Sequence, residues 1–327
     1  MKRLGVLTSG GDAPGTNACI RAVVRTALYH DFEVVGIHRG YRGLMEAEFE
    51  SLHGRFVGGI AHRGGTILKT ARTEKFKTEE GQRQALENLK KHQVDVLVII
   101  GGDGSLKGAL RLHEAGFPVM GVPATIDNDV AFTDMALGVD TAMNTALKAI
   151  DQIKDTATSH RRAFLVETMG RDSGYLALMV GMASAAEAII IPEVPASCEK
   201  ILGMIKEAHG KGKAHFIAVI AEGAKPDCLA IDQYLKEREA DLGFGVRVSI
   251  LGYIQRGGSP TAFDRLLGTR LGAKAVEELA HGRDGSMVGL VGSEVVATEL
   301  EKALARPREV DLSLYELAQR LEIYPGP

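Results

Sequence analysis

One stretch of the sequence, Val96-Leu97-Val98-Ile99-Ile100-Gly101-Gly102-Asp103-Gly104-Ser105, joins an uninterrupted apolar run to a glycine-rich turn. A strand without alternating polar residues is typical of a sheet that is covered on both faces. Helical periodicity follows at residues 105–114. The order of buried strand, tight turn and helix is the unit from which parallel α/β sheets are built.

The same alternation runs through the whole chain. Short β-branched runs predict strands at residues 4–7, 34–37, 94–100, 119–122, 164–167, 188–191, 216–221, 246–251 and 288–291. Helical patterns occupy residues 17–28, 79–91, 105–114, 141–156, 202–209 and 265–280, and Thr78 before two glutamates is a good helix start. Strand–helix alternation implies right-handed crossovers, so the predicted fold class is α/β with mainly parallel sheets.

Length and charge narrow the class of protein. The chain has 327 residues, which corresponds to about two domains. Lys plus Arg number 39 and Asp plus Glu 42, so the net charge is −3. This near balance argues against a nucleic-acid partner and against a basic membrane binder. The charged segment 72–77 is interpreted as either a mobile loop or a solvated connection.

Cysteine usage and hydropathy indicate a location. Cys19, Cys198 and Cys228 form no C-x-x-C pair, which is typical of structural thiols in a reducing compartment. No apolar run reaches the ~18 residues of a membrane span. The best candidate, residues 176–191, is interrupted by Ser184 and Glu187, and the basic start is too short for a signal peptide. A cytoplasmic location without membrane contact is expected.

The chemistry is expected at the carboxyl ends of the strands, where ligands bind in open parallel sheets. Three of these strands are followed by Thr8-Ser9-Gly10-Gly11-Asp12-Ala13-Pro14-Gly15, by Gly101-Gly102-Asp103-Gly104-Ser105 and by Thr125-Ile126-Asp127-Asn128-Asp129. Glycines admit an anion to backbone N–H groups, and a helix N-terminus adds positive potential. Carboxylates beside phosphate require a hard cation such as Mg²⁺ between them. The combination predicts phosphoryl transfer.

Simpler interpretations exist for each motif. Gly-Gly-Asp after a strand is often only a turn, and Asp127 and Asp129 can cap a turn with Asn128. Three such turns on successive strand ends favour a site. The sequence contains no G-x-x-x-x-G-K-[ST], G-x-G-x-x-G, H-E-x-x-H or G-x-S-x-G motif, which argues against other familiar chemistries.

The second half of the chain supplies arginines. Arg162 precedes one predicted strand and Arg171 follows it; Arg247 starts another, and Arg256 follows that one. Guanidinium groups bind phosphate through two parallel hydrogen bonds. Glu222, at the end of a further strand, could accept hydrogen bonds from sugar hydroxyls. Single arginines at strand ends often form surface ion pairs, but four at the ends of two strands favour a second anion site for a phosphorylated substrate.

The blocks Gly10-Gly11-Asp12-Ala13-Pro14-Gly15, Gly101-Gly102-Asp103-Gly104, Thr125-Ile126-Asp127-Asn128-Asp129, Met169-Gly170-Arg171 and Gln255-Arg256-Gly257-Gly258 together resemble the bacterial ATP-dependent 6-phosphofructokinase family. Gly-Gly-Asp-Gly alone also occurs in NAD kinases and lipid kinases. The resemblance covers the whole chain and implies two Rossmann-like three-layer lobes in a homotetramer. Residues 1–138 and 256–304 would bind ATP and Mg²⁺, residues 139–255 and 305–327 would bind fructose 6-phosphate, and the active site would lie in the cleft between the lobes.

The resemblance also implies roles for individual residues. Asp127 would take the proton from the sugar 1-hydroxyl, giving fructose 1,6-bisphosphate and ADP, a glycolytic reaction. The catalytic group would be Asp127, Thr125, Arg171, Gly11 and Arg72, with Mg²⁺ on Asp103 and Asp129. The nucleotide would contact Gly11, Arg72, Gly102, Asp103, Gly104, Ser105 and Gly108. The sugar phosphate would contact Thr125, Asp127, Met169, Gly170, Arg171, Glu222, Tyr253 and Arg256, with Arg162 and Arg247 from a neighbouring subunit.

The phosphoryl donor is inferred from two positions. Pyrophosphate-using relatives place an Asp where Gly104 stands and a Lys where Ala124 stands. A side chain at position 104 would intrude on the α-phosphate of ATP, so Gly104 favours ATP. ATP users usually have Gly at position 124, but Ala124 is small and uncharged. A pyrophosphate-dependent or other sugar-phosphate kinase, and a non-catalytic nucleotide-sensing subunit, remain the alternatives.

Two regions depart from the family pattern. Tyr253 stands where the family usually has His, which predicts weaker affinity for fructose 6-phosphate or a shifted sugar preference, unless the phenol makes an equivalent contact. The family's ADP or phosphoenolpyruvate effector site has lost charge at Gly54, Gly59 and Ala214, so regulation is expected to be reduced or altered. The remaining effector positions are Arg21, Arg25, Arg55, Lys154, Glu187, Lys211, Lys213 and His215.

Overall fold

The computed structural model describes residues 2–321, and its strands alternate with helices as the sequence predicts. The strands are β1 (Arg3–Thr8), β2 (Glu33–Ile37), β3 (Phe49–Leu52), β4 (Val96–Gly101), β5 (Val119–Pro123), β6 (Arg162–Thr168), β7 (Ala188–Ile190), β8 (Phe216–Ala221), β9 (Gly245–Ile250), β10 (Ser286–Val291) and β11 (Glu294–Glu299). Residue 1 and residues 322–327, the end of the predicted second lobe, lie outside the described residues.

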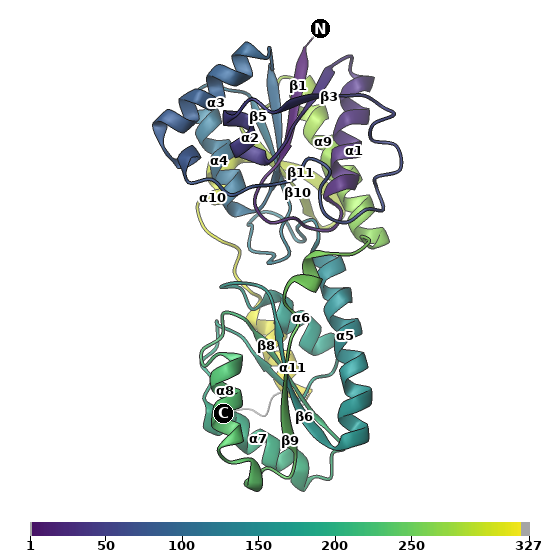
Figure 1. Cartoon of the computed structure of the whole chain (residues 1–327), viewed down its shortest axis with the longest axis vertical. Helices are drawn as coiled ribbons and strands as arrows, with labels where there is room; N and C mark the ends of the chain where they lie inside the picture. Colours follow the sequence, from purple (N-terminus) through teal and green to yellow (C-terminus); the bar gives the residue numbers. More distant parts are fainter. Residues whose placement is uncertain (1, 322–327) are drawn as a thin grey trace. The chain divides into compact units, whose positions relative to one another are not determined.

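Helices fill most of the intervals between the strands (Figure 1). They are α1 (Thr16–Tyr29), α2 (Gly40–Met45), α3 (Glu79–Lys91), α4 (Asp103–Glu114), α5 (Val139–His160), α6 (Tyr175–Ala183), α7 (Cys198–Gly210), α8 (Cys228–Lys236), α9 (Ala262–Ala280), α10 (Leu300–Leu304) and α11 (Leu312–Arg320), with 3₁₀ turns η1 (Lys75–Lys77), η2 (Glu239–Asp241) and η3 (Gly252–Arg256). Side-chain caps set several starts. Thr78 accepts a hydrogen bond from Gly81 N at 3.2 Å, as predicted. Ser197 caps α7, which therefore starts at Cys198, four residues before the start that periodicity indicated.

The first sheet has the order β11-β10-β5-β4-β1-β2-β3. Its central strands are parallel and in step, with Thr8 of β1 opposite Ile100 of β4 and Gly101 of β4 opposite Pro123 of β5. The turns that follow these three strands are therefore neighbours at one edge, which confirms the prediction on which the candidate site depends. Only the outer strands β3 and β11 pair antiparallel with their neighbours.

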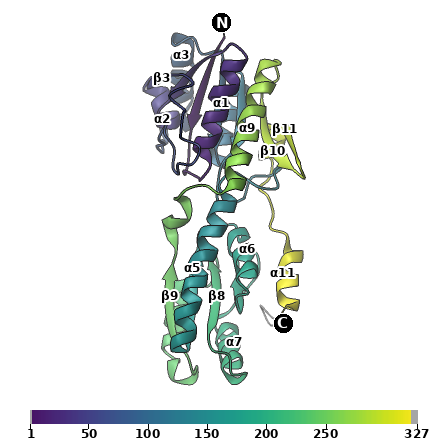
Figure 2. The same ribbon diagram turned by 90° about the vertical axis from the view of Figure 1, so that its right-hand side faces the viewer.

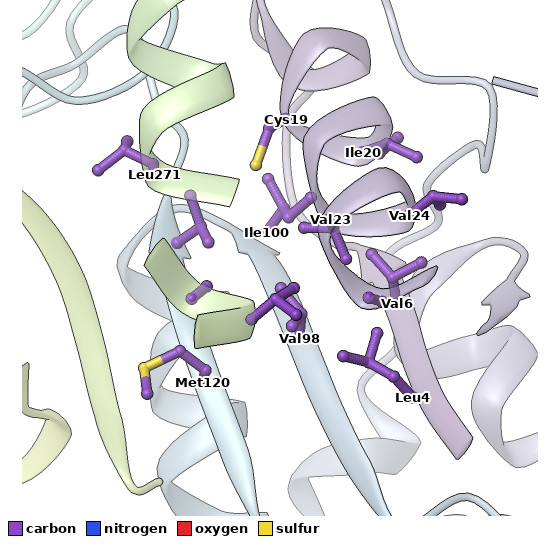
Figure 3. Close-up of a cluster of buried hydrophobic side chains, with 14 of the residues drawn as sticks. Leu4, Val6, Cys19, Ile20, Val23, Val24, Val98, Ile100, Met120 and Leu271 are labelled. Atoms are coloured by element: carbon purple, nitrogen blue, oxygen red, sulfur yellow. The ribbon is translucent and has the colours of Figure 1, made fainter. Parts of the chain in front are cut away.

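Both faces of the first sheet are covered, so it is the middle of three layers. On one face, Leu4, Val6 and Val98 pack against α1 and α9, which lie side by side (Figures 2 and 3). On the other face, Leu97 and Ile99 pack with buried residues of α2, α3, α4 and α10. Alternate residues of one strand thus enter two cores, which explains why β4 carries no polar residue.

The second sheet has the order β7-β8-β6-β9, and all its strands are parallel. Every residue of β8 is buried, so this sheet is also covered on both faces. Residues 176–191 do not form one apolar helix: α6 ends at Ala183 and β7 starts at Ala188. Among the described residues, no helix is long and apolar enough to cross a membrane.

Several elements escape the sequence analysis. The missed strands β3 and β11 are edge strands with many exposed residues, so no apolar run indicates them. The charged segment 72–77 is not wholly open, because η1 buries Phe76 and stacks its ring on Tyr41 at 4.0 Å between ring centroids. Only the part of the segment before Lys75 lacks regular structure.

The chain divides into two compact units. The first comprises residues up to Thr125, Asp129–Thr141 and Arg256–Arg308; the second comprises Ile126–Asn128, Ala142–Gln255 and the residues from Glu309 on. The first unit therefore contains the seven-stranded sheet, and the second contains the four-stranded one.

A buried ion pair in the first unit leads to a stability prediction. Glu278 of α9 is 4% exposed and binds Lys274 Nζ at 2.8 Å and the Arg283 guanidinium. The hydrogen bond from Arg283 lowers the pKa of Glu278 from 4.5 to about 2. The folded state thus favours the ionised form, so this contribution to stability is fully present above about pH 4.5 and is lost as the pH falls toward 2.

Glu278→Gln is expected to lower the melting temperature by roughly 3–6 °C at pH 7, because it removes charge-assisted hydrogen bonds worth about 1–2 kcal/mol next to an exposed arginine. The difference from the unchanged chain should shrink below pH 4.5. Thermal melting followed by circular dichroism at pH 7 and at pH 3.5 measures both effects. The exposed neighbour Glu277 provides the control, since Glu277→Gln should leave the melting temperature unchanged. A difference that persists undiminished at pH 3.5 contradicts the prediction.

Candidate active site

The turns after β1 and β4 are packed against each other. Ser9 N donates to Ile100 O at 3.0 Å, and a Cβ atom at Gly101 would overlap the Ser9 carbonyl oxygen. Gly10 has φ +83°, a conformation that side chains rarely adopt. Close backbone approach therefore explains why glycine occupies positions 10 and 101. The adjacent residues Gly11 and Gly102 carry no side chain that could cover their own backbone N–H groups.

Helix α4 starts at the second turn. Asp103 lies in its first turn and forms an ion pair with Lys107 at 2.7 Å, and its side chain remains 39% exposed. Gly104 is exposed, and a Cβ atom there would meet nothing within 4 Å. An open helix N-terminus of this kind attracts phosphate groups. The start of α4 therefore has the open space that the predicted anion site requires.

Two aromatic residues that the sequence analysis missed support this helix start. Tyr41 is 5% exposed and donates from its hydroxyl to Ser105 O at 2.6 Å. A Cβ atom at Gly108 would lie 2.6 Å from the Tyr41 hydroxyl oxygen, so Gly108 provides the space for the ring. Phe76 stacks on the ring of Tyr41. No local pattern in the sequence indicates this contact, since Tyr41 and Ser105 are 64 residues apart.

The two ends of the third turn, Thr125 and Asp129, are fixed by backbone contacts within the first unit. Thr125 N donates to Leu137 O at 3.1 Å, and a Cβ atom at Gly102 would lie 3.4 Å from Thr125 Cβ. Asp129 O accepts from Arg308 N at 2.9 Å. Asn128 has φ +50°, which directs the chain sharply between the two aspartates. The turn therefore places Thr125 beside the Gly101–Gly102 turn, as the strand order predicts.

Four predicted site residues meet in the second unit. The Arg171 guanidinium lies 3.5 Å from Asp127 Oδ2, and the Asp127 side chain is only 6% exposed. Glu222 Oε1 accepts hydrogen bonds from Arg171 N at 2.6 Å and Gly170 N at 3.2 Å. In such an arrangement the buried carboxylate can accept a proton, and the half-exposed guanidinium can bind an anion beside it. One oxygen of Glu222 is thus engaged in holding the loop that carries Arg171.

Next to this cluster, Glu167 is half-buried in β6, and burial together with the charge of Glu222 raises its pKa. Its neighbour Met169 is buried.

The four arginines lie at the two ends of their strands, in the order that the sequence indicates. Arg162 is the first residue of β6 and Arg247 lies near the start of β9, whereas Arg171 and Arg256 follow the carboxyl ends of these strands. Seven residues of extended strand span about 20 Å, so the two pairs belong to opposite edges of the sheet.

Other predicted residues lie at the surface of their own unit. Arg72 is exposed, and the Tyr253 side chain is among the most exposed large ones, at 78%. Arg256 reaches the turn after β1, where a Cβ atom at Gly11 would lie 2.8 Å from Arg256 Nη1. Gly11 thus allows the guanidinium to approach the backbone directly, a contact that residue types alone do not indicate.

The predicted effector residues are divided between the two units. In the first, Arg25 donates to Gly54 O at 2.8 Å, and Arg21 and Arg55 are partly or fully exposed. In the second, Lys213 pairs with Glu187 at 3.2 Å, His215 lies 2.9 Å from Thr158 Oγ1, Lys211 pairs with Glu207 at 2.7 Å, and Lys154 donates to Ser184 O. Most of these charged groups therefore already contact the chain itself.

An open helix start for one phosphate, and an arginine beside a buried carboxylate for a second anion, are requirements of phosphoryl transfer. The fold and the site together define this protein as an α/β phosphotransferase. The model of the phosphofructokinase family matches residues 3–279 of the chain. The chain belongs to the phosphofructokinase family.

Known relatives are similar along the full chain. ATP-dependent 6-phosphofructokinases of Natranaerobius thermophilus and Halalkalibacterium halodurans are 50% and 51% identical over 323 residues, covering 99% of this chain and 100% of each relative. The structure of phosphofructokinase from Saccharomyces cerevisiae matches with a TM-score of 0.85 and 32% identity over 99% of this chain. This chain spans 47% of that yeast chain.

Proposed function

We infer that the chain transfers a phosphoryl group from ATP to the 1-hydroxyl of fructose 6-phosphate, which yields fructose 1,6-bisphosphate and ADP in glycolysis. The observation that carries this inference is the buried Asp127 carboxylate beside Arg171. Similarity to ATP-dependent 6-phosphofructokinases over 99% of the chain supports the choice of donor and acceptor.

We propose Asp127 as the general base. An alcohol is a poor nucleophile, and removing its proton as the attack proceeds lowers the barrier. Arg171, 3.5 Å away, can offset charge on the transferred group. Thr125 would orient the hydroxyl, while the N–H group of Gly11 and the side chain of Arg72 would stabilise charge on the phosphoryl oxygens.

The proposed nucleotide site is the start of α4, formed by Gly102, Asp103, Gly104, Ser105 and Gly108. Mg²⁺ commonly takes one or two protein carboxylates and completes its coordination with phosphate oxygens and water. Within residues 2–321, no three His, Cys, Asp or Glu side chains form a ready metal cage. Asp103, which is accessible at the helix start, and Asp129 would supply the one or two protein carboxylates that such an ion commonly takes. When bound, the ion would neutralise phosphate charge near Gly104.

The proposed sugar-phosphate site uses Met169, Gly170, Arg171 and Glu222 of one subunit, together with Tyr253 and Arg256. Arg162 and Arg247 are proposed to serve a neighbouring subunit, because they lie at the opposite sheet edge from Arg171. A site that takes arginines from two subunits supports an oligomer, which we propose to be a homotetramer. The proposed location is the cytoplasm, and the free cysteines are typical of a reducing compartment.

Steady-state turnover of fructose 6-phosphate with Mg²⁺ and either ATP or pyrophosphate tests the function, with Asp127→Ser as the inactive control. Turnover with ATP that is lost in the variant supports the proposal. Turnover with pyrophosphate alone favours the pyrophosphate-dependent alternative. Nucleotide binding without turnover of either donor favours a sensing subunit that has lost the reaction.

A substitution at Tyr253 tests the sugar-phosphate site. Tyr253→His is expected to lower the KM for fructose 6-phosphate several-fold, most clearly below pH 7, because a protonated imidazole adds positive charge near the phosphate whereas a phenol cannot. The kcat with ATP should change little. Initial rates at pH 6 and pH 8 measure the effect, with Tyr253→Phe as the control for the hydroxyl. An unchanged KM and sugar selectivity in Tyr253→His contradicts the prediction.

We propose that regulation by ADP and phosphoenolpyruvate is reduced or altered. Each charge-assisted contact is worth about 1.5–3 kcal/mol, and Gly54 and Gly59 supply none. Gly54→Arg and Gly59→Asp together are expected to strengthen ADP activation at least tenfold, by restoring charges at these positions. Effector titrations of initial rate measure the change. Strong ADP activation of the unchanged chain contradicts the proposal.

A further inference from the structure

Asn17, on the first turn of α1, has a buried amide whose hydrogen bonds all go to one loop. The residue is 1% exposed. Its Nδ2 donates to Arg63 O at 3.0 Å and to Gly64 O at 3.1 Å, and its Oδ1 accepts from Ile67 N at 2.9 Å. Both amide protons and the carbonyl oxygen are therefore engaged. A buried amide that is satisfied by three bonds specifies the conformation of the backbone that it binds.

The loop that Asn17 holds, residues 63–70, touches other parts of the proposed catalytic site. Thr70 Oγ1 donates to Gly10 O at 2.8 Å, next to Gly11. Gly64 lies against the Gln255-Arg256-Gly257-Gly258 block, since a Cβ atom at Gly64 would overlap Gly258 O. Two residues beyond Thr70 the chain reaches Arg72. One loop thus connects the turn after β1, the Arg256 block and Arg72.

No helix or strand hydrogen bonding fixes this loop, because residues 61–74 contain no regular element. Besides Asn17, its anchors are Thr8, whose Oγ1 contacts Thr66 Oγ1 and Lys69 O at 2.9 Å each, and the Arg39 backbone, whose N donates to Leu68 O at 2.8 Å. The Leu68 side chain is buried. The position of Arg72 relative to Gly11 therefore depends on individual tertiary contacts, of which Asn17 supplies three, rather than on secondary structure.

We propose that Asn17 is a positioning residue for phosphoryl transfer: through the 63–70 loop it sets the placement of Arg72 against the Gly10–Gly11 turn. The proposal rests on the role proposed above for Arg72. Without the amide, two carbonyls and one N–H group of the loop lose their partner, and the loop must shift to find water. A displacement of about 1 Å in a positioned group can reduce a rate on the order of 100-fold.

A double-mutant cycle tests the proposal in the full chain, with kcat and the KM for each substrate as readouts. Asn17→Ala alone is expected to lower kcat at least tenfold, with a smaller change in the KM for fructose 6-phosphate. In the Arg72→Ala background the same substitution should have little further effect, because residues that act through one another are not additive. Asn88 is the matched control: its Nδ2 also donates to two successive carbonyls, Leu44 O at 3.0 Å and Met45 O at 2.8 Å.

Asn88→Ala should lower the melting temperature and leave kcat unchanged in both backgrounds, which separates a structural effect from a positional one. If the losses in kcat from Asn17→Ala and Arg72→Ala are independent, so that the fold-losses multiply in the double variant, the inference about Asn17 is overturned and the role of Arg72 is not. If Arg72→Ala keeps full kcat, the inference about Asn17 and the proposed role of Arg72 are both overturned. Should Asn17→Ala fail to fold, Thr70→Val removes only the bond to Gly10 O; a smaller, non-additive loss supports the proposal, and no loss or an additive one overturns it.

Discussion

Asp127→Asn is expected to lower kcat by about 100- to 10,000-fold and to leave the KM values for ATP and fructose 6-phosphate within a few-fold. The amide keeps the shape of the carboxylate but cannot accept the proton of the sugar hydroxyl. The Asp127 side chain is 6% exposed, so water has little room to replace it as a base. The variant also leaves Arg171 without its negative partner, which should tighten rather than weaken binding of an anionic substrate.

Initial-rate measurements over both substrate concentrations separate kcat from the KM values. Asp232→Asn is a suitable control, because Asp232 is also a largely buried carboxylate, 13% exposed, and pairs with a cation, Lys236, at 2.7 Å. It should affect the melting temperature and leave kcat unchanged. An Asp127→Asn variant that retains more than a tenth of the original kcat contradicts the assignment of Asp127 as the base.

The sequence predicts the central part of the fold because local and long-range preferences agree there. The apolar runs of β1, β4 and β5 can only be strands covered on both faces, and parallel strands place their carboxyl ends at one edge. The neighbouring positions of the three turns follow from these two facts. Edge strands such as β3 and β11 carry no comparable pattern, because exposed residues dominate them.

Residues whose role depends on tertiary contacts could not be predicted in the same way. Tyr41 matters because its ring fits over Gly108, and Asn17 because its amide faces a loop some fifty residues later. The arginines show what the sequence can give: Arg162 starts β6 and Arg171 follows it, so the strand itself separates them, as its position in the sequence indicates. Local patterns give the edge at which a residue lies, but not its partners across the fold.

Gly104→Asp is expected to lower kcat/KM for ATP about 1,000-fold without destabilising the chain. A carboxylate about 4 Å from a phosphate charge costs about 4 kcal/mol at an effective dielectric constant near 20, and each ~1.4 kcal/mol is tenfold in rate. The fold should tolerate the change because a Cβ atom at Gly104 meets nothing within 4 Å. An acidic residue in the first turn of α4 also interacts favourably with the helix dipole.

Two further variants separate the physical causes. Gly104→Ala adds bulk without charge, so it should lose only a small part of the kcat/KM for ATP. Gly108→Ala, one turn later, should lower the melting temperature, because its Cβ atom would lie 2.6 Å from the Tyr41 hydroxyl oxygen. Comparing kcat/KM with thermal melting for the three variants distinguishes a position where only the ligand is affected, Gly104, from one where the packing of the chain changes as well, Gly108.

Gly104→Asp alone is not expected to produce pyrophosphate-dependent turnover. The pyrophosphate-using pattern pairs the acidic residue with a Lys at position 124, and here that position is occupied by Ala124, which is 3% exposed. An added carboxylate repels the phosphates of either donor when no cation accompanies it. Turnover assays with both donors measure the outcome. A variant that keeps its kcat/KM for ATP would show that the nucleotide does not pass over Gly104, and the start of α4 would then no longer be the donor site.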